Sequence, residues 1–420
     1  MNVHDSEKMS GILKSDGYVE TDNPKDADII IFNTCSIREK AEQKFFSKLG
    51  RLKTLKKRNP SLKIAVAGCI AQQQKEKIFQ RAPFVDYVLG PQNLHLMSKV
   101  AELQAHSAAC DENPIIAATD FSVDRKDRIK AWVTIMYGCN NFCSYCVVPY
   151  TRGREKSRPS SNILHEIQGL AHEGFKEITL LGQNVNSYRS DLDFTGLLSN
   201  INKILGIERI RFVTSHPKDL SHDLVYAMRD LDKVCEHIHL PLQSGSTRIL
   251  KLMNRKYNYE DYIKKIEFLR KTIPDISITT DIIAGFPEET AADHSLTLKA
   301  LREIAFDGIY AFNYSSRPGT KASEFPGHID EDVSSGRLYE ILDLQNSITD
   351  QKNRELKGSI QEVLLETTSN NREGHLLSGR TRSNKIVNIA SEGQVGPAEI
   401  VRVRIIKANR HSMEGIVQEE

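Results

Sequence analysis

This chain of 420 residues lacks the features that mark membrane and secreted proteins. No apolar run approaches the length needed to cross a bilayer, and residues 1–9 lack the apolar core of a signal peptide. Seven cysteines are an odd number in a large chain, so a disulfide framework is not expected and metal or redox use of the thiols is favoured. We therefore expect a cytoplasmic protein with no membrane partner.

An excess of charge of one sign is also absent. The formal net charge of +2 gives no global argument for binding nucleic acid, so any such site has to be local. The apolar share of 39% and the charged share of 27% are ordinary for a globular protein. The length favours about three domains with room for sizeable cores.

Three cysteines stand close together at Cys139, Cys143 and Cys146. A structural zinc site needs four ligands, and no further cysteine or histidine lies within ten residues on either side. Three thiolates suit an iron-sulfur cluster with one open iron, which can chelate S-adenosylmethionine and cleave it to a carbon radical. The spacing therefore predicts a radical-generating cluster. A structural metal knuckle or three unrelated buried thiols are the alternatives.

Residues 1–104 alternate short β-rich runs with helical ones, which predicts a doubly wound parallel α/β domain. Cys35 and Cys69 each follow a predicted strand, so a parallel sheet would bring both to one edge, where they could share a metal centre. A pair of buried small thiols is the alternative. We expect strands at 27–33, 63–68 and 85–89 and a helix from about 38 to 57.

The stretch 105–127 shows little periodicity, and we interpret it as a linker between domains. Cys110 within it has small polar neighbours and no partner spaced for ligation, so we expect it to be a bystander.

Residues 128–350 carry six strand candidates separated by helices, which predicts a partial (β/α)6 TIM-like barrel. The cysteine loop follows the first strand, where such a barrel places its active site. The candidates span residues 131–136, 177–181, 209–213, 237–240, 277–283 and 308–313.

Amides, glycines and a Gly-Phe-Pro turn follow four of these strands. Each is an ordinary βα turn by itself, but four at one rim beside the cysteine loop favour a pocket for a nucleoside and an amino-acid moiety. We expect cofactor contacts from Gln183, Asn184, Gln243, Ser244, Ile283, Phe286 and Arg317.

Residues 354–418 look all-β, which predicts a small OB-like barrel. Apolar residues alternate with arginines from Ile400 to Ile405, and a second basic run follows the cysteine loop. Outward cations on such barrels often bind RNA, although they are as easily a solvated face. The residues expected to contact RNA are Arg152, Arg154, Arg380, Arg382, Arg402 and Arg404.

Together these features resemble the methylthiotransferases of the radical S-adenosylmethionine superfamily. The resemblance rests on Asn33 to Ser36, Gly68-Cys69, the cysteine loop and the C-terminal barrel, and it extends over nearly the whole chain. The stretches Cys35 to Ala41 and Cys146 to Glu155 are most similar to the MiaB-type tRNA enzymes.

The resemblance implies a fold, an activity and partners. The activity is insertion of a methylthio group at carbon two of isopentenyladenosine at position 37, beside the anticodon of tRNA. The partners are the anticodon stem-loop and an electron donor such as flavodoxin or ferredoxin, and we expect a monomer. The final barrel corresponds to the TRAM domain, which is associated with tRNA binding.

It also implies two 4Fe-4S clusters, with S-adenosylmethionine as both radical source and methyl donor. The three cysteines of the loop would hold the radical-generating cluster, and Tyr145 would lie near the cofactor adenine. Cys35 and Cys69 would hold an auxiliary cluster associated with the sulfur to be transferred.

The chain departs from the family pattern at its first residue. The family's auxiliary cluster takes a third cysteine in a Gly-Cys-Gln segment directly before Met-Asn, whereas this sequence begins at Met1-Asn2. We expect the natural start to lie upstream and to supply that ligand. The alternatives for the function are a methylthiotransferase acting on another tRNA adenosine or on a ribosomal protein, and an RNA-binding protein with structural metal sites.

Overall fold

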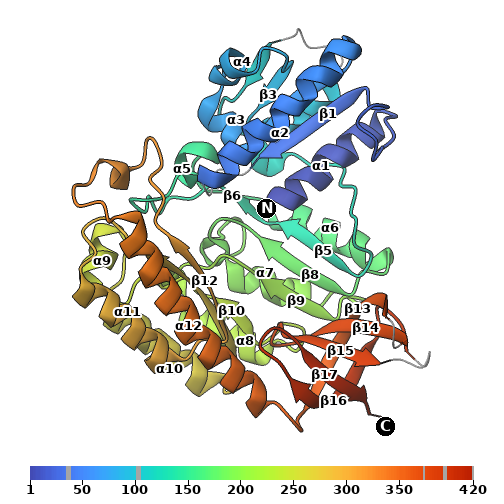
Figure 1. The fold of residues 1–420 in the computed structure, drawn as a ribbon. Coiled ribbons are helices and arrows are strands. Elements are labelled where there is room, and N and C mark those ends of the chain that lie inside the picture. Colours follow the sequence, from blue (N-terminus) through green and yellow to red (C-terminus); the bar gives the residue numbers. More distant parts are fainter. Residues whose placement is uncertain (35–38, 101–105, 372–373, 391–394, 419–420) are drawn as a thin grey trace. The chain divides into compact units, whose positions relative to one another are not determined.

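The computed structural model describes residues 1–34, 39–100, 106–371, 374–390 and 395–418 (Figure 1). The chain forms two compact units. The first comprises residues 1–127, 136–142 and 146–162, and the second comprises residues 128–135, 143–145 and 163–420. Of the described helices, none is both long and apolar enough to span a membrane.

The first unit contains a four-stranded parallel sheet in the order β1-β2-β3-β4. Alternate residues of β2 enter opposite cores, as the period of a strand requires. Ile64 and Val66 pack with α2 residues such as Leu49, and Ala65 and Ala67 pack in a second cluster that includes Met9 of α1. Helices on both faces make the domain doubly wound, as predicted. The strands are β1 (Ile29–Thr34), β2 (Lys63–Gly68), β3 (Tyr87–Leu89) and β4 (Ser107–Ala109), and the helices are α1 (Asn2–Ser15), α2 (Glu39–Arg58), α3 (Cys69–Gln74), α4 (Lys77–Arg81) and η1 (Leu94–Lys99).

The stretch interpreted as a linker differs from that interpretation. Residues 107–109 form β4, which pairs in parallel with β3, and a short 3-10 helix, η2 (Ile116–Ala118), follows. Cys110 directly follows β4 and is buried in the apolar cluster of the sheet. Burial raises the pKa of its thiol to about 11, which suits an inert core residue. A strand of serine and alanine has no hydrophobic alternation, so its sequence carries no strand signal.

The second unit is built on six parallel strands in two groups, β5-β8-β9 and β10-β11-β12. A single parallel bridge between Ile210 and Val234 links the groups, and helices alternate with the strands along the chain. All six predicted strands are present. They are β5 (Lys130–Thr134), β8 (Glu177–Leu181), β9 (Arg209–Phe212), β10 (His237–His239), β11 (Ser277–Ala284) and β12 (Gly308–Asn313), with α6 (Ser160–His172), α7 (Phe194–Asn202), α8 (His222–Asp230), α9 (Thr247–Leu252), α10 (Tyr259–Thr272), α11 (Ala291–Ile304) and α12 (Glu331–Glu355).

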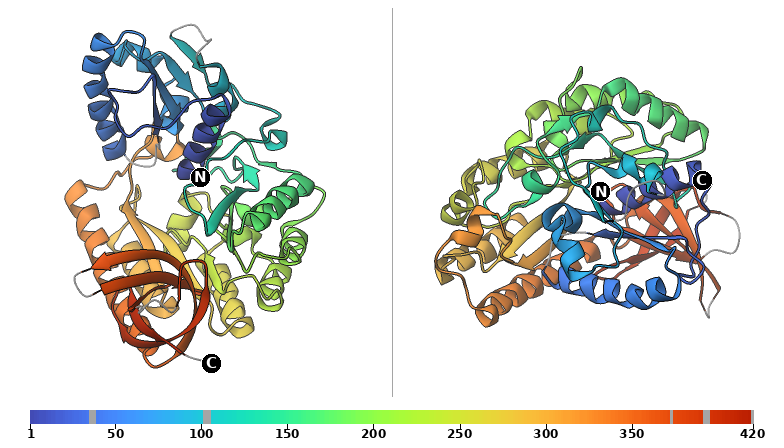
Figure 2. Two further views of the ribbon diagram at one scale, coloured as in Figure 1. Left: turned by 90° about the vertical axis from the view of Figure 1, so that its right-hand side faces the viewer. Right: turned by 90° about the horizontal axis from the view of Figure 1, so that it is seen from above.

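The C-terminal part of the second unit is a closed barrel in the order β13-β14-β15-β17-β16, seen as a ring in the left view of Figure 2. Val403 and Ile405 point into its core, whereas Arg402 and Arg404 are exposed, which confirms the predicted alternation. The strands are β13 (Ile360–Asn371), β14 (Gly374–Thr381), β15 (Ile386–Ala390), β16 (Ile400–Ala408) and β17 (Met413–Val417).

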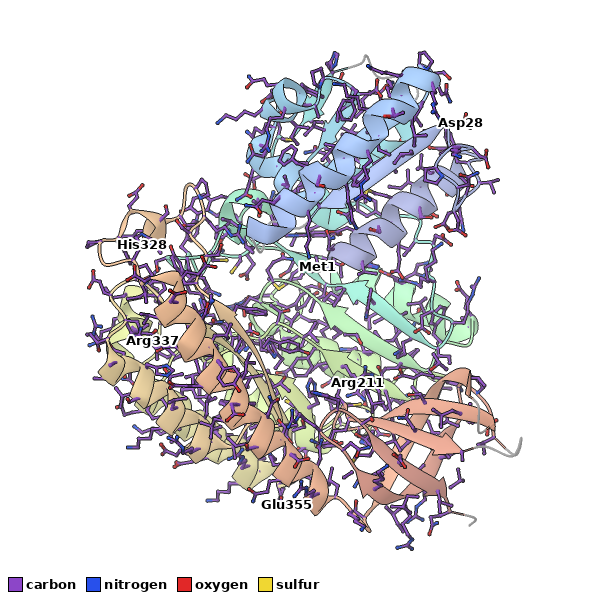
Figure 3. All side chains as sticks on the ribbon, in the orientation of Figure 1. Met1, Asp28, Arg211, His328, Arg337 and Glu355 are labelled. Carbon is purple, nitrogen blue, oxygen red and sulfur yellow. The ribbon has the colours of Figure 1, made fainter. Side chains whose placement is uncertain are left out.

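Two buried arginines of β9 hold this barrel against the six-stranded core. Arg209 is fully buried and donates to the carbonyl oxygens of Arg380 (2.7 Å) and Glu362 (3.1 Å). Arg211 donates to the carbonyl oxygens of Arg382 (2.8 Å) and Thr381 (2.8 Å), and Figure 3 marks it where β9 meets the barrel. Backbone acceptors that would otherwise be buried without a donor are thereby satisfied.

Candidate active site

The cysteine loop begins at Gly138, where the backbone requires glycine. Its φ is +71°, and an added Cβ would lie 2.1 Å from the carbonyl oxygen of Arg154. This close approach lets the Cys139 amide donate to the Gly153 carbonyl (3.1 Å). The Asn141 amide faces the Cys139 sulfur at 3.5 Å. The thiol of Cys139 is therefore buried in a loop that directs a backbone donor at the sulfur.

Cys143 and Tyr145, from the same loop, belong to the second unit and share one partner, Arg255. Arg255 donates from Nη1 to the Cys143 sulfur (3.2 Å) and to the Tyr145 hydroxyl (3.4 Å). Its other contacts are the Tyr257 hydroxyl and the Pro241 carbonyl. Burial alone would lower the pKa of Arg255, but the two tyrosines and Cys143 raise that pKa well above its usual value, so the guanidinium keeps its charge.

Such a buried cation suits a metal-bound thiolate, because cluster ligation leaves negative charge on the sulfur. Sequence reasoning missed Arg255, which lies in a loop after α9 with no spacing signal to the cysteines.

The rim formed by the ends of β8 and β9 contains buried polar atoms without hydrogen-bond partners among the described residues. Both amide atoms of Gln183 are in this state, as are the Asn184 Oδ1 and the Ser215 hydroxyl. The Nδ2 atom of Asn184 donates to the Asp219 carboxylate (2.7 Å). Unpartnered buried polar groups are costly, so their grouping after two neighbouring strands fits a polar ligand.

His216 adds a donor of known direction to this rim. Burial, with Arg255 nearby, lowers the pKa of His216 to about 2, so the ring is neutral. Its Nδ1 accepts the Lys218 amide (3.2 Å), which assigns the proton to Nε2. The Nε2 atom is buried and has no partner within the described residues. A carboxylate, such as that of an amino-acid ligand, would satisfy this donor.

An apolar cluster lies next to the polar rim, at the end of β11. Phe286 is fully buried at its centre, and Tyr145 and Ile283 pack against this cluster. The Tyr145 and Phe286 rings meet edge to face with centroids 6.4 Å apart. Three predicted cofactor residues are therefore brought together. Such a surface suits an adenine ring.

Gln243, Ser244 and Arg317 are also buried, and their contact with a cofactor stays a prediction. Gln243 has a φ of +75° and bridges to Ile282, and the Ser244 hydroxyl lies 3.4 Å from that of Thr297. The Arg317 carbonyl accepts the Thr320 amide. Thr214, a β-branched residue after β9, also has a φ of +69°. Strained backbone at strand ends is a common feature of binding sites.

In the first unit, Cys69 lies at the start of α3 beside Arg152. Gly68 precedes it with a φ of +94°, and a Cβ there would lie 2.3 Å from the Thr34 carbonyl oxygen. Arg152 is buried and donates from Nη2 to Asp5 (2.6 Å), and the nearby Asp5 and Cys69 raise the pKa of its guanidinium against the effect of burial. Arg152 was expected on RNA, but its side chain is instead turned inward to Asp5 and Cys69. Cys35 lies outside the described residues.

The other arginines predicted to bind RNA fall into two groups. Arg380 and Arg382 help to join the barrel to the core, since Arg382 forms a bidentate ion pair with Glu236 (2.7 and 2.8 Å) and Arg380 supplies a carbonyl to Arg209. Arg402, Arg404 and Arg154 are exposed. Periodicity alone could not separate arginines that dock a domain from arginines that face solvent.

A cavity of about 280 Å³ lies at the opposite end of the strands, where β12 begins. Asp307, Lys385 and Arg410 line it, and none of the predicted cofactor residues does. The polar rim and the cysteine loop therefore remain the candidate site.

The donor set of the loop fits a cluster better than a single ion. Across the described ranges, no three histidine, cysteine or acidic side chains are grouped to hold one metal ion. The cysteines of a 4Fe-4S cluster each bind a different iron, so they stand farther apart than ligands of one ion. Cys139 and Cys143 are buried, Cys146 is partly exposed, and N–H donors directed at the first two sulfurs suit thiolates that carry cluster charge.

Comparisons with known proteins support the same assignment. The family models of "Uncharacterized protein family UPF0004", the radical SAM superfamily and the TRAM domain match residues 1–90, 133–301 and 354–417. A Thermodesulfovibrio yellowstonii protein named tRNA-2-methylthio-N(6)-dimethylallyladenosine synthase is 58% identical over 417 residues, 99% of this chain and 96% of that protein. The chain belongs to this family of radical SAM tRNA methylthiotransferases.

Other relatives agree with this membership. An Acetivibrio thermocellus protein of the same name is 49% identical over 431 residues, covering 99% of this chain and 88% of that protein. Among solved structures, the radical S-adenosylmethionine methyltransferase TsrM from Kitasatospora setae has a TM-score of 0.53 at 12% identity, covering 84% of this chain and 72% of that one. At that identity the likeness shows the radical SAM fold alone.

Proposed function

We propose that this chain is a tRNA-2-methylthio-N(6)-dimethylallyladenosine synthase, which inserts sulfur at carbon two of isopentenyladenosine at position 37 of tRNA and methylates it. The observation that carries the proposal is the buried contact of Arg255 with Cys143 and Tyr145, beside a rim of unpartnered polar atoms. That arrangement occurs in a chain 58% identical to a protein with this name. Sulfur insertion at an unactivated aromatic C–H bond requires a radical, because no base can remove such a hydrogen as a proton.

In this proposal the cysteine loop, the apolar cluster and the polar rim each have a distinct task. Cys139, Cys143 and Cys146 hold a 4Fe-4S cluster that, with bound S-adenosylmethionine, supplies the radical. Tyr145, Ile283 and Phe286 contact the adenine of the cofactor. The Nε2–H of His216 and the amide of Gln183 bind its amino-acid end, because those buried atoms need partners of complementary polarity.

The first unit contains the residues proposed to bind the auxiliary cluster, which is associated with the sulfur to be transferred. Cys35 and Cys69 are proposed ligands of the auxiliary 4Fe-4S cluster. Arg152 and Asp5 orient Cys69, since a buried ion pair beside the thiol fixes its surroundings. A second S-adenosylmethionine supplies the methyl group by ordinary nucleophilic transfer to sulfur.

The proposed partners are a cytoplasmic tRNA, bound through its anticodon stem-loop, and an electron carrier such as flavodoxin or ferredoxin. We propose a monomer. Exposed Arg402 and Arg404 on the C-terminal barrel are the candidate phosphate contacts, since a protein of net charge +2 must bind RNA locally.

Nucleoside analysis of tRNA from a strain lacking the gene tests the function. The methylthio nucleoside should disappear and should return with the natural gene but not with a Cys143→Ala copy. Unchanged methylthio-adenosine levels in the deletion strain would overturn the tRNA assignment. If purified protein with reductant and S-adenosylmethionine forms no 5′-deoxyadenosine, radical chemistry itself is excluded and structural metal sites are favoured.

A further inference from the structure

Three side chains around the cysteine loop form a cluster of two aromatic rings and a cation. The rings of Phe142 and Tyr150 pack edge to face, with centroids 6.0 Å apart and an interplanar angle of 86°. The guanidinium carbon of Arg154 lies 4.3 Å from the centre of the Phe142 ring. All three residues belong to the first unit, and we call them the loop platform.

The backbone at Phe142 is unusual. Its φ is +48°, in the left-handed region that glycine adopts freely and bulky residues avoid. Strained positions of this kind persist where the surroundings or the function fix them, and they gather at ligand sites. Directly before Cys143, the chain therefore has an aromatic residue in a conformation that glycine would adopt more easily.

Burial in a core does not account for Tyr150 and Arg154. Tyr150 is 58% exposed and Arg154 is also exposed, so little of their surface is buried in a core. Within the described part of the chain, no carboxylate forms an ion pair with Arg154. A comparable pair in the second unit, Tyr226 with Arg229, differs on this point because Asp230 neutralises Arg229.

We propose that the loop platform stacks an unpaired base of the RNA substrate, a neighbour of the modified adenosine. Proteins bind single-stranded RNA by stacking bases on aromatic and arginine side chains, while the free charge of the arginine attracts phosphate. Phe142 precedes one cluster cysteine, and the helix of Tyr150, α5 (Val148–Thr151), begins two residues after another. A base stacked there would lie beside the proposed cluster cysteines. Holding this neighbouring base would help to keep the target adenosine out of the base stack, as enzymes that modify a base require. The identity of the RNA rests on the proposed function.

Binding of a fluorescent anticodon stem-loop RNA to the full chain tests this inference. Tyr150→Ala should weaken binding about tenfold or more, because stacking of one base is worth about that factor. Tyr150→Phe, which keeps the ring, should bind within about twofold of the parent. Tyr226→Ala is the matched control, and its affinity should not change. Equal binding by Tyr150→Ala and the parent overturns the proposal.

A double-mutant cycle with the RNA identifies the contact. Stem-loops with a single abasic site should include one position at which loss of the base weakens binding to the parent but not to Tyr150→Ala. If every abasic position weakens both proteins equally, no base stacks on Tyr150 and the proposal fails. If Tyr150→Ala also loses iron, Arg154→Gln replaces it in the same cycle, because it leaves both rings in place. RNA binding is measured without turnover. The stacking proposal can therefore fail while methylthiolation is intact, and stacking can be observed even if the proposed methylthiolation activity is not.

Discussion

Arg255 places a full positive charge against Cys143, a proposed cluster ligand, inside the second unit. Reduction of a cluster adds negative charge, and N–H donors to its sulfurs favour the reduced form. Arg255→Gln should therefore lower the reduction potential of the cluster by about 60 to 130 mV, because a charged hydrogen bond is worth about 1.5–3 kcal/mol. A redox titration followed by electron paramagnetic resonance measures the shift. Arg248→Gln removes an equal charge that pairs with Asp293 instead, and it should leave the potential unchanged.

Replacing Gln183 should affect protein stability and cofactor binding in opposite directions. Its buried amide atoms have no partners among the described residues, so Gln183→Leu should leave the cofactor-free chain as stable as before or up to about 1 kcal/mol more stable. The same change should weaken S-adenosylmethionine binding about tenfold, because the ligand loses its partner. Urea unfolding and calorimetry measure the two effects.

Asn186 is the matched control for Gln183 in the same turn. Its amide is satisfied twice, by the His216 carbonyl (2.9 Å) and the His216 amide (2.8 Å). Asn186→Leu should destabilise the chain by about 1–3 kcal/mol, since it leaves those buried groups unpaired. A loss of stability in Gln183→Leu of the same size would contradict the view of Gln183 as a ligand-binding residue.

At the scale of single residues, the sequence predicts a functional role only where the spacing between residues along the chain is itself informative. The cysteine loop could be recognised because three thiols within eight residues are rare, and Tyr145 came with the family resemblance. Arg255 and His216 could not be found in this way, because tertiary packing alone brings each of them to the site. Arg152 looked like a phosphate contact because its neighbours are basic, and only burial beside Asp5 reveals a different role.

Among the elements, β9 is both a strand of the six-stranded core and the attachment point of the C-terminal barrel, because its arginines hydrogen-bond to that barrel. Arg209 is fully buried and gives three hydrogen bonds, including one to the Glu362 carboxylate (2.9 Å). Arg209→Met should destabilise this junction by about 3 kcal/mol, because Glu362 and two carbonyls lose their donor. Limited proteolysis should then cleave near Gly358, between α12 and β13. Arg404→Met removes an exposed arginine of the same barrel and should not increase cleavage there.

The strands of the second unit were predictable because buried parallel strands are short apolar runs at regular spacing. β4 was missed because serine and alanine give no such signal, although β4 pairs in parallel with β3. The role of Arg380 and Arg382 at the junction was also missed, since an arginine on a strand has the same alternation whether it meets solvent or another domain.

Over the whole molecule, buried histidines make stability depend on pH. Burial lowers the pKa of His237 to about 3 and that of His216 to about 2, and it lowers the pKa of His4 well below its ordinary value. The folded state therefore keeps these rings neutral, while the unfolded chain takes up protons below about pH 6.5. Their contribution is fully present above that pH and is lost as the pH falls towards the folded values.

His237 allows this effect to be measured in one unit of the protein. The only tryptophan, Trp132, lies on β5 in that same unit, so its fluorescence during urea unfolding reports on the surroundings of His237. Between pH 7 and pH 5 the free energy of unfolding should fall by about 2 kcal/mol less in His237→Gln than in the parent, since one proton uptake is removed. His222→Gln changes an exposed histidine of the same unit and should keep the full slope. Equal slopes in the parent and His237→Gln would mean that His237 already carries its proton in the folded state at pH 5.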